Sequence, residues 1–146
     1  MVFSQEYSVS GVFGVVSRED CVADLFYGTD YHSHFGTKRG GMAVINGDGF
    51  SRFIHDITNA QFKSKFEHDI GKMRGHWGIG VISDYEDQPL LIGSRHGRYA
   101  IVTVGRVDNL SALAEFCLSR NSTHFSELKG NEYNQTEVVA TLINRA

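Results

Sequence analysis

The sequence predicts a mixed α+β fold, a layered sandwich with helices outside. The first observation is a set of apolar runs of strand length, interrupted by glycine, at residues 11–16, 40–45 and 77–83. Runs without polar alternation are typical of strands that are covered on both faces. The second observation is the helical spacing of apolar residues between such runs, at residues 22–26, 62–70 and 110–117. Because doubly covered strands need a layer on each side, we expect the helices to pack outside them.

Size and composition restrict the class of protein. The chain of 146 residues has room for one domain with a hydrophobic core. Its net charge of −3, with no basic cluster beyond Lys38-Arg39, argues against a nucleic-acid partner. No apolar run approaches the length of a membrane span, and the N-terminus lacks a signal-peptide pattern. Cys21 and Cys117 have no C-x-x-C partner and are interpreted as buried thiols in a reducing compartment, so a cytoplasmic location is expected.

The N-terminal stretch contains the first candidate functional residue. Residues 1–9 show no clear period and are interpreted as a leader or an extra N-terminal segment, followed by one domain over 10–146. Ser10 leads into the apolar strand, where Gly11 and Gly14 keep the backbone bare and allow a close approach. Ser10 is therefore either a nucleophile at the tip of a buried strand or an ordinary serine at a strand entrance, and this stretch leaves both open.

Turn signals divide the next part of the chain. A polar break at residues 17–20 precedes apolar positions on one helical face, so we expect a helix that begins near residue 22 and fades near 31–36. The turn sequence at residues 46–49 predicts a hairpin between the strand at 40–45 and a return strand at 51–55.

Capping signals predict a second helix and lead into another strand. Thr58 and Gln61 have the spacing of a capping box, and Gly71 is placed to end the helix. The glycine-rich run that follows, residues 77–83, is expected to be a buried strand, with Trp77 interpreted as a core residue. An acidic loop follows at residues 85–88.

The C-terminal half repeats the alternation of strands and helices. Strands are expected at residues 90–92 and 99–104, joined by a solvated basic turn, and the second of them is expected to be covered on both faces. A helical stripe covers residues 110–117. Asn134 and Glu137 have capping-box spacing at the start of the final helix.

Several stretches, taken in their order and spacing, resemble one protein family. They are Ser10-Gly11-Val12-Phe13-Gly14, Ser33-His34-Phe35-Gly36, Gly78-Ile79-Gly80 with Gln88-Pro89 after it, Val104-Gly105, and Asn134-Gln135-Thr136-Glu137. In the same order, they resemble five motifs of class II glutamine amidotransferases. These are the terminal nucleophile with Gly-Val-Phe-Gly, the Gln-His-Arg-Gly loop, the Gly-Ile-Gly strand with its Gln-Pro pair, the Asn-Gly turn and the Ser-Asp-Ser-Glu helix start. The resemblance covers residues 10–146 and is closest to the glutaminase domain of amidophosphoribosyltransferases.

This resemblance implies a fold, a site and partners. The fold implied is the N-terminal-nucleophile hydrolase sandwich with four αββα layers, of which residues 10–146 would be a truncated part. Ser10 would stand at the nucleophile position beside a pocket for a glutamine-like small molecule. The pocket positions implied are Gly11, His34, Gly36, Ser83, Val104, Gly105 and Gln135. The partners implied are a downstream phosphoribosyltransferase domain or a partner subunit, in a homo-oligomer.

The chain departs from the family at the positions that carry chemistry. The family's nucleophile is a cysteine whose free amine is the base, whereas here Ser10 has nine residues ahead of it and would need their removal. Ser83 replaces the arginine that holds the glutamine carboxylate, and Val104 replaces the asparagine that stabilises the oxyanion. Gln135 replaces the acidic residue that pairs with the glutamine α-amine.

Three hypotheses follow from these departures. The first is a domain that keeps the fold, has lost glutaminase activity and has a structural or regulatory role. The second is an active amidohydrolase that delivers ammonia with Ser10 as a processed N-terminal nucleophile. The third is a ligand sensor that keeps the old pocket for another small molecule. We favour the first.

Other candidate sites have weaker patterns. His32 and His34, with Asp30 nearby, have the spacing of a metal-binding pair but no third ligand, so loop histidines are the favoured interpretation. We expect neither a metal nor a cofactor. The basic turn Arg95-His96-Gly97-Arg98 could meet a phosphate, although a solvated hairpin tip is favoured.

Overall fold

The structure is a computed structural model that describes residues 10–35, 38–120 and 123–146. The expected leader, residues 1–9, and the pocket position Gly36 lie outside the described residues. Within the part of the chain that the structure describes, no helix is long and apolar enough to cross a membrane.

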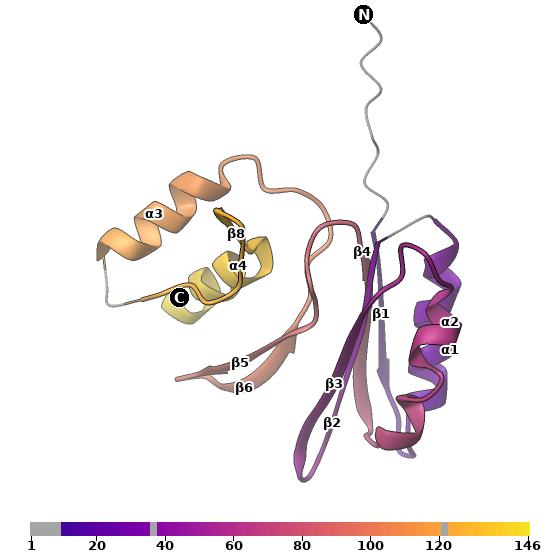
Figure 1. Ribbon diagram of the computed structural model, residues 1–146. Coiled ribbons are helices and arrows are strands. Elements are labelled where there is room, and N and C mark those ends of the chain that lie inside the picture. The colour runs from indigo at the N-terminus through magenta and orange to yellow at the C-terminus, as the bar shows by residue number, and fades with distance from the viewer. Residues whose placement is uncertain (1–9, 36–37, 121–122) are drawn as a thin grey trace, which may run out of the picture.

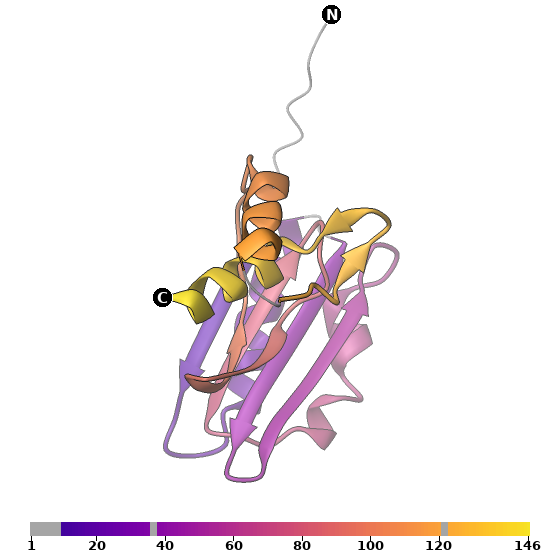
Figure 2. The ribbon, with the colours of Figure 1, turned by 90° about the vertical axis from the view of Figure 1, so that its left-hand side faces the viewer.

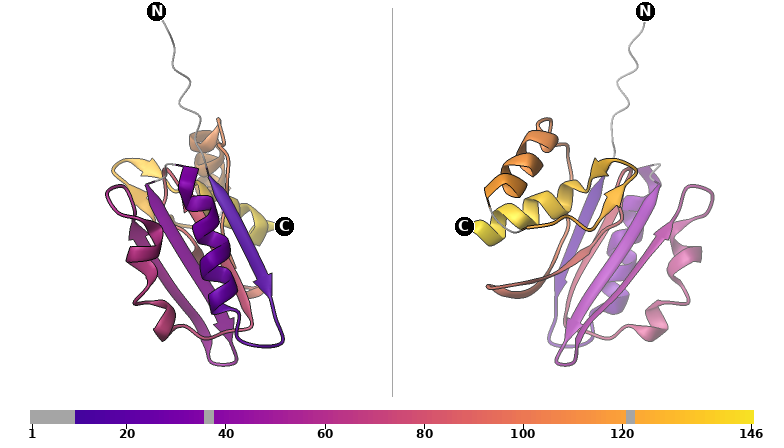
Figure 3. Two further views of the ribbon diagram at one scale, coloured as in Figure 1. Left: turned by 90° about the vertical axis from the view of Figure 1, so that its right-hand side faces the viewer. Right: turned by 60° about the vertical axis from the view of Figure 1, so that its left-hand side comes forward.

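A four-stranded antiparallel sheet forms the larger half of the molecule. It contains β1 (Gly11–Val16), β2 (Arg39–Asn46), β3 (Gly49–Asp56) and β4 (Trp77–Ser83), in the spatial order β1-β4-β2-β3. Helices α1 (Val22–His32) and α2 (Phe62–Phe66), with the short 3-10 turns η1 (Ser33–Phe35) and η2 (Ile70–Lys72), cover one face of this sheet (Figures 1 and 3).

The second half of the molecule lies across the opposite face of the sheet. It contains the hairpin of β5 (Leu90–Ser94) and β6 (Gly97–Ile101), the helices α3 (Leu110–Arg120) and α4 (Gln135–Arg145), and the small hairpin of β7 (Leu128–Lys129) and β8 (Glu132–Tyr133). Figure 2 shows α3 and α4 in front of the upper part of the large sheet, with the β5–β6 hairpin below them. Helices cover one face of the large antiparallel sheet, and the second half of the molecule lies over the other face, so the expected mixed α+β fold is confirmed.

The hydrophobic core lies between the large sheet and its two helices. Phe62 and Phe66 of α2 stack with their ring centroids 4.2 Å apart, and both are almost completely buried. Gly80 of β4 gives α1 room to approach, because a Cβ there would lie 1.9 Å from Thr29 Oγ1. The Thr29 hydroxyl donates to the Leu25 carbonyl at 2.7 Å, so this buried polar group is satisfied within its own helix.

Four sequence-based elements agree closely with the structure. Helix α1, the hairpin of β2 and β3, and helix α3 lie where periodicity and turn residues place them. Helix α4 begins at its expected cap, where the Asn134 side chain accepts from the Glu137 backbone N–H at 3.0 Å. The reciprocal half of the capping box is replaced, because the Glu137 carboxylate accepts from the backbone N–H groups of Ser126 and Glu127 at 2.9 Å each.

The prediction that strand 11–16 is covered on both faces is wrong. β1 is an edge strand whose residues alternate between half-buried and exposed, and Val16 is 74% exposed. Its register partner Trp77 is 62% exposed, so the interpretation of Trp77 as a core residue is also wrong. The physical reason is that β1 is an edge strand, and the second half of the molecule lies beside only the upper part of the large sheet (Figure 1).

Two other elements are shorter than expected. Helix α2 spans five residues. Gln61 stands at its N-cap position without a side-chain cap hydrogen bond, and the Thr58 backbone N–H donates to the Asp56 carboxylate at 2.8 Å instead of starting the helix. Strand β6 ends at Ile101, so residues 102–104 form a connection rather than the end of a doubly covered strand.

Gly41 brings the two halves together. A Cβ at Gly41 would lie 1.6 Å from the Gln88 carbonyl oxygen and 2.8 Å from Pro89 Cδ, so the loop between β4 and β5 rests directly on the backbone of β2. Arg52 of β3 fixes the same loop by donating from Nη1 to the Pro89 carbonyl at 3.0 Å. This contact fixes where the second half of the molecule starts.

Substitution of Gly41 by alanine is expected to lower the free energy of unfolding by about 1–3 kcal/mol, the usual cost of overpacking. The added Cβ meets backbone atoms, which cannot rotate away. Urea denaturation measures the effect. Gly14→Ala in β1 is the matched control, because its Cβ would lie 4.0 Å from the nearest atom, and it is expected to change little. Equal losses in the two variants would contradict the close contact.

Candidate functional site

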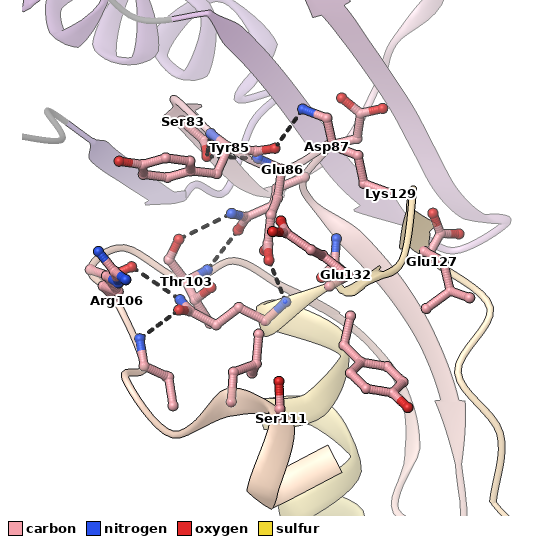
Figure 4. Close-up of a pocket in the computed structure, with 18 of the residues that line it drawn as sticks. Ser83, Tyr85, Glu86, Asp87, Thr103, Arg106, Ser111, Glu127, Lys129 and Glu132 are labelled. Carbon is pink, nitrogen blue, oxygen red and sulfur yellow. Dashed lines mark hydrogen bonds between the residues drawn. The ribbon is translucent and has the colours of Figure 1, made fainter. Parts of the chain in front are cut away.

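The candidate site is a cavity of about 1140 Å³ between the end of the large sheet and the second half of the molecule. Its walls come from the β4–β5 loop, the connection before α3 with the start of α3, and the segment from the β7–β8 hairpin to the start of α4 (Figure 4). Ser10 and Arg39 complete it from the sheet. The cavity therefore joins segments that are far apart in the sequence.

The sheet contributes a row of polar residues at one end. Arg39, the first residue of β2, is the register partner of Ser83, the last residue of β4. Gly11 of β1 is the register partner of Ile82, so the same register continued by one residue brings Ser10 beside Ser83. Register partners in antiparallel strands project from the same face. The row therefore runs Ser10, Ser83, Arg39 across three neighbouring strands and faces the cavity.

Glu86 links the β4–β5 loop to the start of α4. Its carboxylate accepts from the Gln135 backbone N–H, from the Thr136 backbone N–H at 3.2 Å and from the Thr136 hydroxyl at 2.9 Å. A negative charge at a helix N-terminus is favoured by the unpaired N–H groups and the helix dipole. Figure 4 shows the Glu86 side chain directed toward that helix.

Two glutamine side chains hold the loops of the cavity wall. Gln88 Oε1 accepts from the Thr103 backbone N–H at 2.7 Å, and Gln88 Nε2 donates to the Thr103 carbonyl at 3.2 Å. Gln135 Oε1 accepts from the Val107 backbone N–H at 2.7 Å, and Gln135 Nε2 donates to the Gly105 carbonyl at 3.0 Å. Each amide thus occupies both its donor and its acceptor end with backbone groups of one loop.

Charged side chains of both signs line the cavity. Arg39 Nε lies 3.3 Å from Asp87 Oδ1, and Arg39 Nη1 lies 3.5 Å from Asp56 Oδ2. Hydrogen bonds from Thr58, and then the Arg39 and Lys65 charges, hold the pKa of Asp56 below its ordinary value of 3.8. The acidic lining residues are Glu86, Asp87, Asp108, Glu127 and Glu132, and the basic ones are Arg39, Arg106 and Lys129.

The structure brings some of the sequence-predicted site residues together. Ser10, Ser83, Gly105 and Gln135 line the one cavity. Val104 is 48% exposed and is not among the lining residues. The remaining described positions, Gly11 and His34, also lie outside the lining. A Cβ added at Gly11 would lie 2.9 Å from the His32 Cβ, so Gly11 packs against α1. His34 belongs to η1.

Sequence reasoning missed two residues of the site, Arg39 and Glu86. Arg39 was visible only as half of a basic pair, and Glu86 only as part of an acidic loop. No local signal marks either one, because each acts through a contact with a distant segment. For the histidine pair His32 and His34, the structure shows no metal-binding cluster: among the described residues, no group of three His, Cys, Asp or Glu side chains is close enough to hold a metal ion.

Comparison with known proteins relates the fold to two solved structures. No protein-family model matches the chain, and no curated protein matches its sequence. One similar structure is a glutamine phosphoribosylpyrophosphate (PRPP) amidotransferase from B. subtilis complexed with ADP and GMP, with a TM-score of 0.74. The other is described as the allosteric regulatory enzyme of purine biosynthesis, with a TM-score of 0.75.

The sequence identity and the coverage of these two matches determine what can be concluded from them. Each match has 23% sequence identity and covers 92% of this chain, but this chain spans only 29% of each of those proteins. A likeness at this level of identity shows the fold. The fold that the sequence resemblance implied is therefore confirmed as the fold of the chain.

Replacement of Glu86 by glutamine is expected to lower the free energy of unfolding by about 1–3 kcal/mol, because it removes charge-assisted bonds and turns an amide N–H₂ toward helix donors. Thermal or urea denaturation measures it. Asp108→Asn is the control: it also neutralises a cavity acid, but the Asp108 side chain is 93% exposed and pairs only loosely with Arg106, at 3.6 Å. A loss in the control as large as in Glu86→Gln would contradict the assigned role.

Asp56 predicts a pH dependence of stability. Its folded-state pKa is lowered, so the unfolded chain binds the proton more readily and the contribution of Asp56 is present above the ordinary value of 3.8. That contribution is lost as the pH falls through the folded-state pKa. We expect Asp56→Asn to lose stability less steeply than the wild type below about pH 4. Denaturant midpoints measured from pH 2.5 to 6 would reveal parallel curves if Asp56 contributed nothing.

Proposed function

We propose that the chain is a domain of the glutamine amidotransferase type that has lost glutaminase activity and has a structural or regulatory role. The observation that carries this proposal is the state of Gln135. At the position where the family resemblance implies an acidic group for the ligand amine, an uncharged amide bonds at both ends to the 105–107 loop of its own chain. A side chain engaged in this way supports the cavity wall instead of pairing with a charged ligand group.

The other positions carried over from the resemblance support the same proposal. Ser83 has no positive charge for a ligand carboxylate, and its Oγ accepts from the backbone N–H groups of Tyr85 and Glu86 at 3.4 Å each. Val104 has no side-chain donor for an oxyanion, and loss of one such donor typically lowers the rate by about 100- to 1000-fold. These losses act on binding and on the transition state independently.

The nucleophile position adds a requirement of its own. The N-terminal mechanism uses a free α-amine as the base that activates the hydroxyl of the same residue. While residues 1–9 are attached, the Ser10 nitrogen is part of a peptide bond and has no basic lone pair. Glutamine hydrolysis by this mechanism would therefore need a cut between Val9 and Ser10.

An active amidohydrolase is the second candidate, favoured by one observation. Ser10 lines the same cavity as Ser83, Gly105 and Gln135, so a nucleophile at this position would face a bound ligand. In that case the chain would be processed before Ser10 and would release ammonia from glutamine.

A partner domain is part of the favoured proposal. This chain spans 29% of each of the two similar proteins, one of which is a PRPP amidotransferase. We propose that a phosphoribosyltransferase domain or a partner subunit, in a homo-oligomer, receives the structural or regulatory effect of this domain.

A glutaminase assay with intact-mass analysis of the same sample tests the proposal. We expect glutamate release from glutamine no faster than that of Ser10→Ala, and a mass that still includes residues 1–9. Glutamate release that disappears in Ser10→Ala, together with a mass that begins at Ser10, would favour the active amidohydrolase instead. A bacterial glutaminase added to a parallel sample controls for the sensitivity of the assay.

A further inference from the structure

We propose that Arg39 is the anion-binding residue of the cavity, and that the cavity takes a small carboxylate whose carboxyl group replaces Asp87 at the Arg39 guanidinium. This inference deepens the proposed regulatory role by naming the ligand class of the same cavity. It rests on the position of Arg39, its burial, the geometry of its present ion pairs and the charge balance of the lining.

The strand register places Arg39 where a cation reaches the cavity. Arg39 of β2 and Ser83 of β4 are register partners and both line the cavity. Cβ atoms of register partners in an antiparallel pair lie about 4.5–5.5 Å apart on the same face. The Arg39 side chain therefore leaves the sheet on the same face as that of Ser83, which is uncharged, and adds a positive charge to the cavity wall.

Burial distinguishes Arg39 from the acids that pair with it. The Arg39 side chain is 31% exposed, whereas those of Asp87 and Asp56 are 57% and 56% exposed. A partly desolvated guanidinium gains more from a close anion than an exposed one does, because less of its charge is screened by water. Arg39 is thus the fixed member of the cluster and Asp87 is the exchangeable one.

The present ion pairs leave binding capacity at Arg39. Its distances of 3.3 and 3.5 Å to Asp87 and Asp56 exceed the 2.7–2.9 Å of a typical charge-assisted hydrogen bond. A guanidinium carries five N–H donors in a planar fork that fits a carboxylate through two parallel bonds. A ligand carboxylate that approaches from the cavity can therefore make shorter bonds than Asp87 does.

The charge balance of the lining selects the kind of anion. Five acidic and three basic side chains line the cavity, so their combined field opposes a second negative charge on the ligand. A monocarboxylate meets this balance better than a phosphate dianion does.

Exchange at Asp87 would also be felt outside the cavity. Asp87 lies between Glu86, which accepts from the start of α4, and Gln88, whose amide bonds to Thr103. Release of Asp87 from Arg39 removes the ion pair that ties to β2 the loop that holds both of these contacts. This gives a bound carboxylate a physical route to the second half of the molecule.

Binding of matched small molecules to the whole chain at low ionic strength tests the inference. The probes are butyrate, its uncharged analogue butyramide, L-glutamine and inorganic phosphate, with heat of binding and amide NMR shifts as readouts. We expect butyrate and L-glutamine to bind, butyramide not to bind, and phosphate to bind more weakly than butyrate. Equal binding of butyrate and butyramide, or tighter binding of phosphate, would overturn the proposal.

Variants assign the binding to Arg39. We expect Arg39→Gln to abolish butyrate binding and Arg39→Lys to weaken it by about tenfold, because a lysine loses the bidentate geometry. Asp87→Asn removes the competing carboxylate and is expected to tighten binding by at least about threefold. Asp108→Asn is the matched control, since it neutralises another lining acid that pairs with Arg106 instead, and it is expected to change the affinity by less than about twofold.

If Arg39→Gln fails to fold, the comparison of Asp87→Asn with Asp108→Asn still tests the role of Arg39. Equal tightening in Asp87→Asn and Asp108→Asn would show a general charge effect and overturn the role of Arg39. The glutaminase assay distinguishes this failure from failure of the proposed function. Lack of carboxylate binding leaves the loss of glutaminase activity untouched, whereas glutamate release with binding through Arg39 overturns only the proposed function.

Discussion

The contact between Gly41 and the Gln88 carbonyl is the constraint on which the rest of the structure depends. It leaves no space for a side chain on β2, and it fixes the β4–β5 loop where three consecutive residues act on three different elements. Glu86 holds the start of α4, Asp87 pairs with Arg39, and Gln88 holds the backbone of Thr103. The arrangement of the layers and the shape of the cavity are therefore set by the same short segment.

The role of this loop explains why polar residues of the cavity act mainly within the chain. The loops at 103 and at 105–107 contribute no strand of their own beside the cavity, so their backbone groups need other partners. The side chains of Gln88 and Gln135 supply these partners. In the proposed function, a side chain used for wall support is not available to a ligand, so loss of catalysis and retention of the fold follow from one change of partners.

The sequence predicts local elements well and contacts between them poorly. Helical periodicity and turn residues are sufficient for α1, for the β2–β3 hairpin and for the Asn134 cap, because each depends on neighbours in the sequence. The cover of β1 was predicted wrongly, since valine and glycine suit a covered or an exposed face alike and cover comes from segments that are distant in the sequence. At the cavity, Ser10, Ser83, Gly105 and Gln135 were named through the family resemblance. Arg39 and Glu86 were missed because strand register and helix contacts leave no local pattern.

The position of Arg39 in the sheet bears on whether binding and catalysis stay coupled. Neighbouring strands lie about 4.7–4.9 Å apart, and the row at the sheet end runs from Ser10 on β1 through Ser83 on β4 to Arg39 on β2. A carboxylate held from β2 instead of β4 therefore lies about one strand spacing farther from Ser10. A displacement of about 1 Å can already cost about 100-fold in rate. A cation moved by one strand can thus preserve carboxylate binding in this cavity while taking the rest of the ligand out of reach of the nucleophile position.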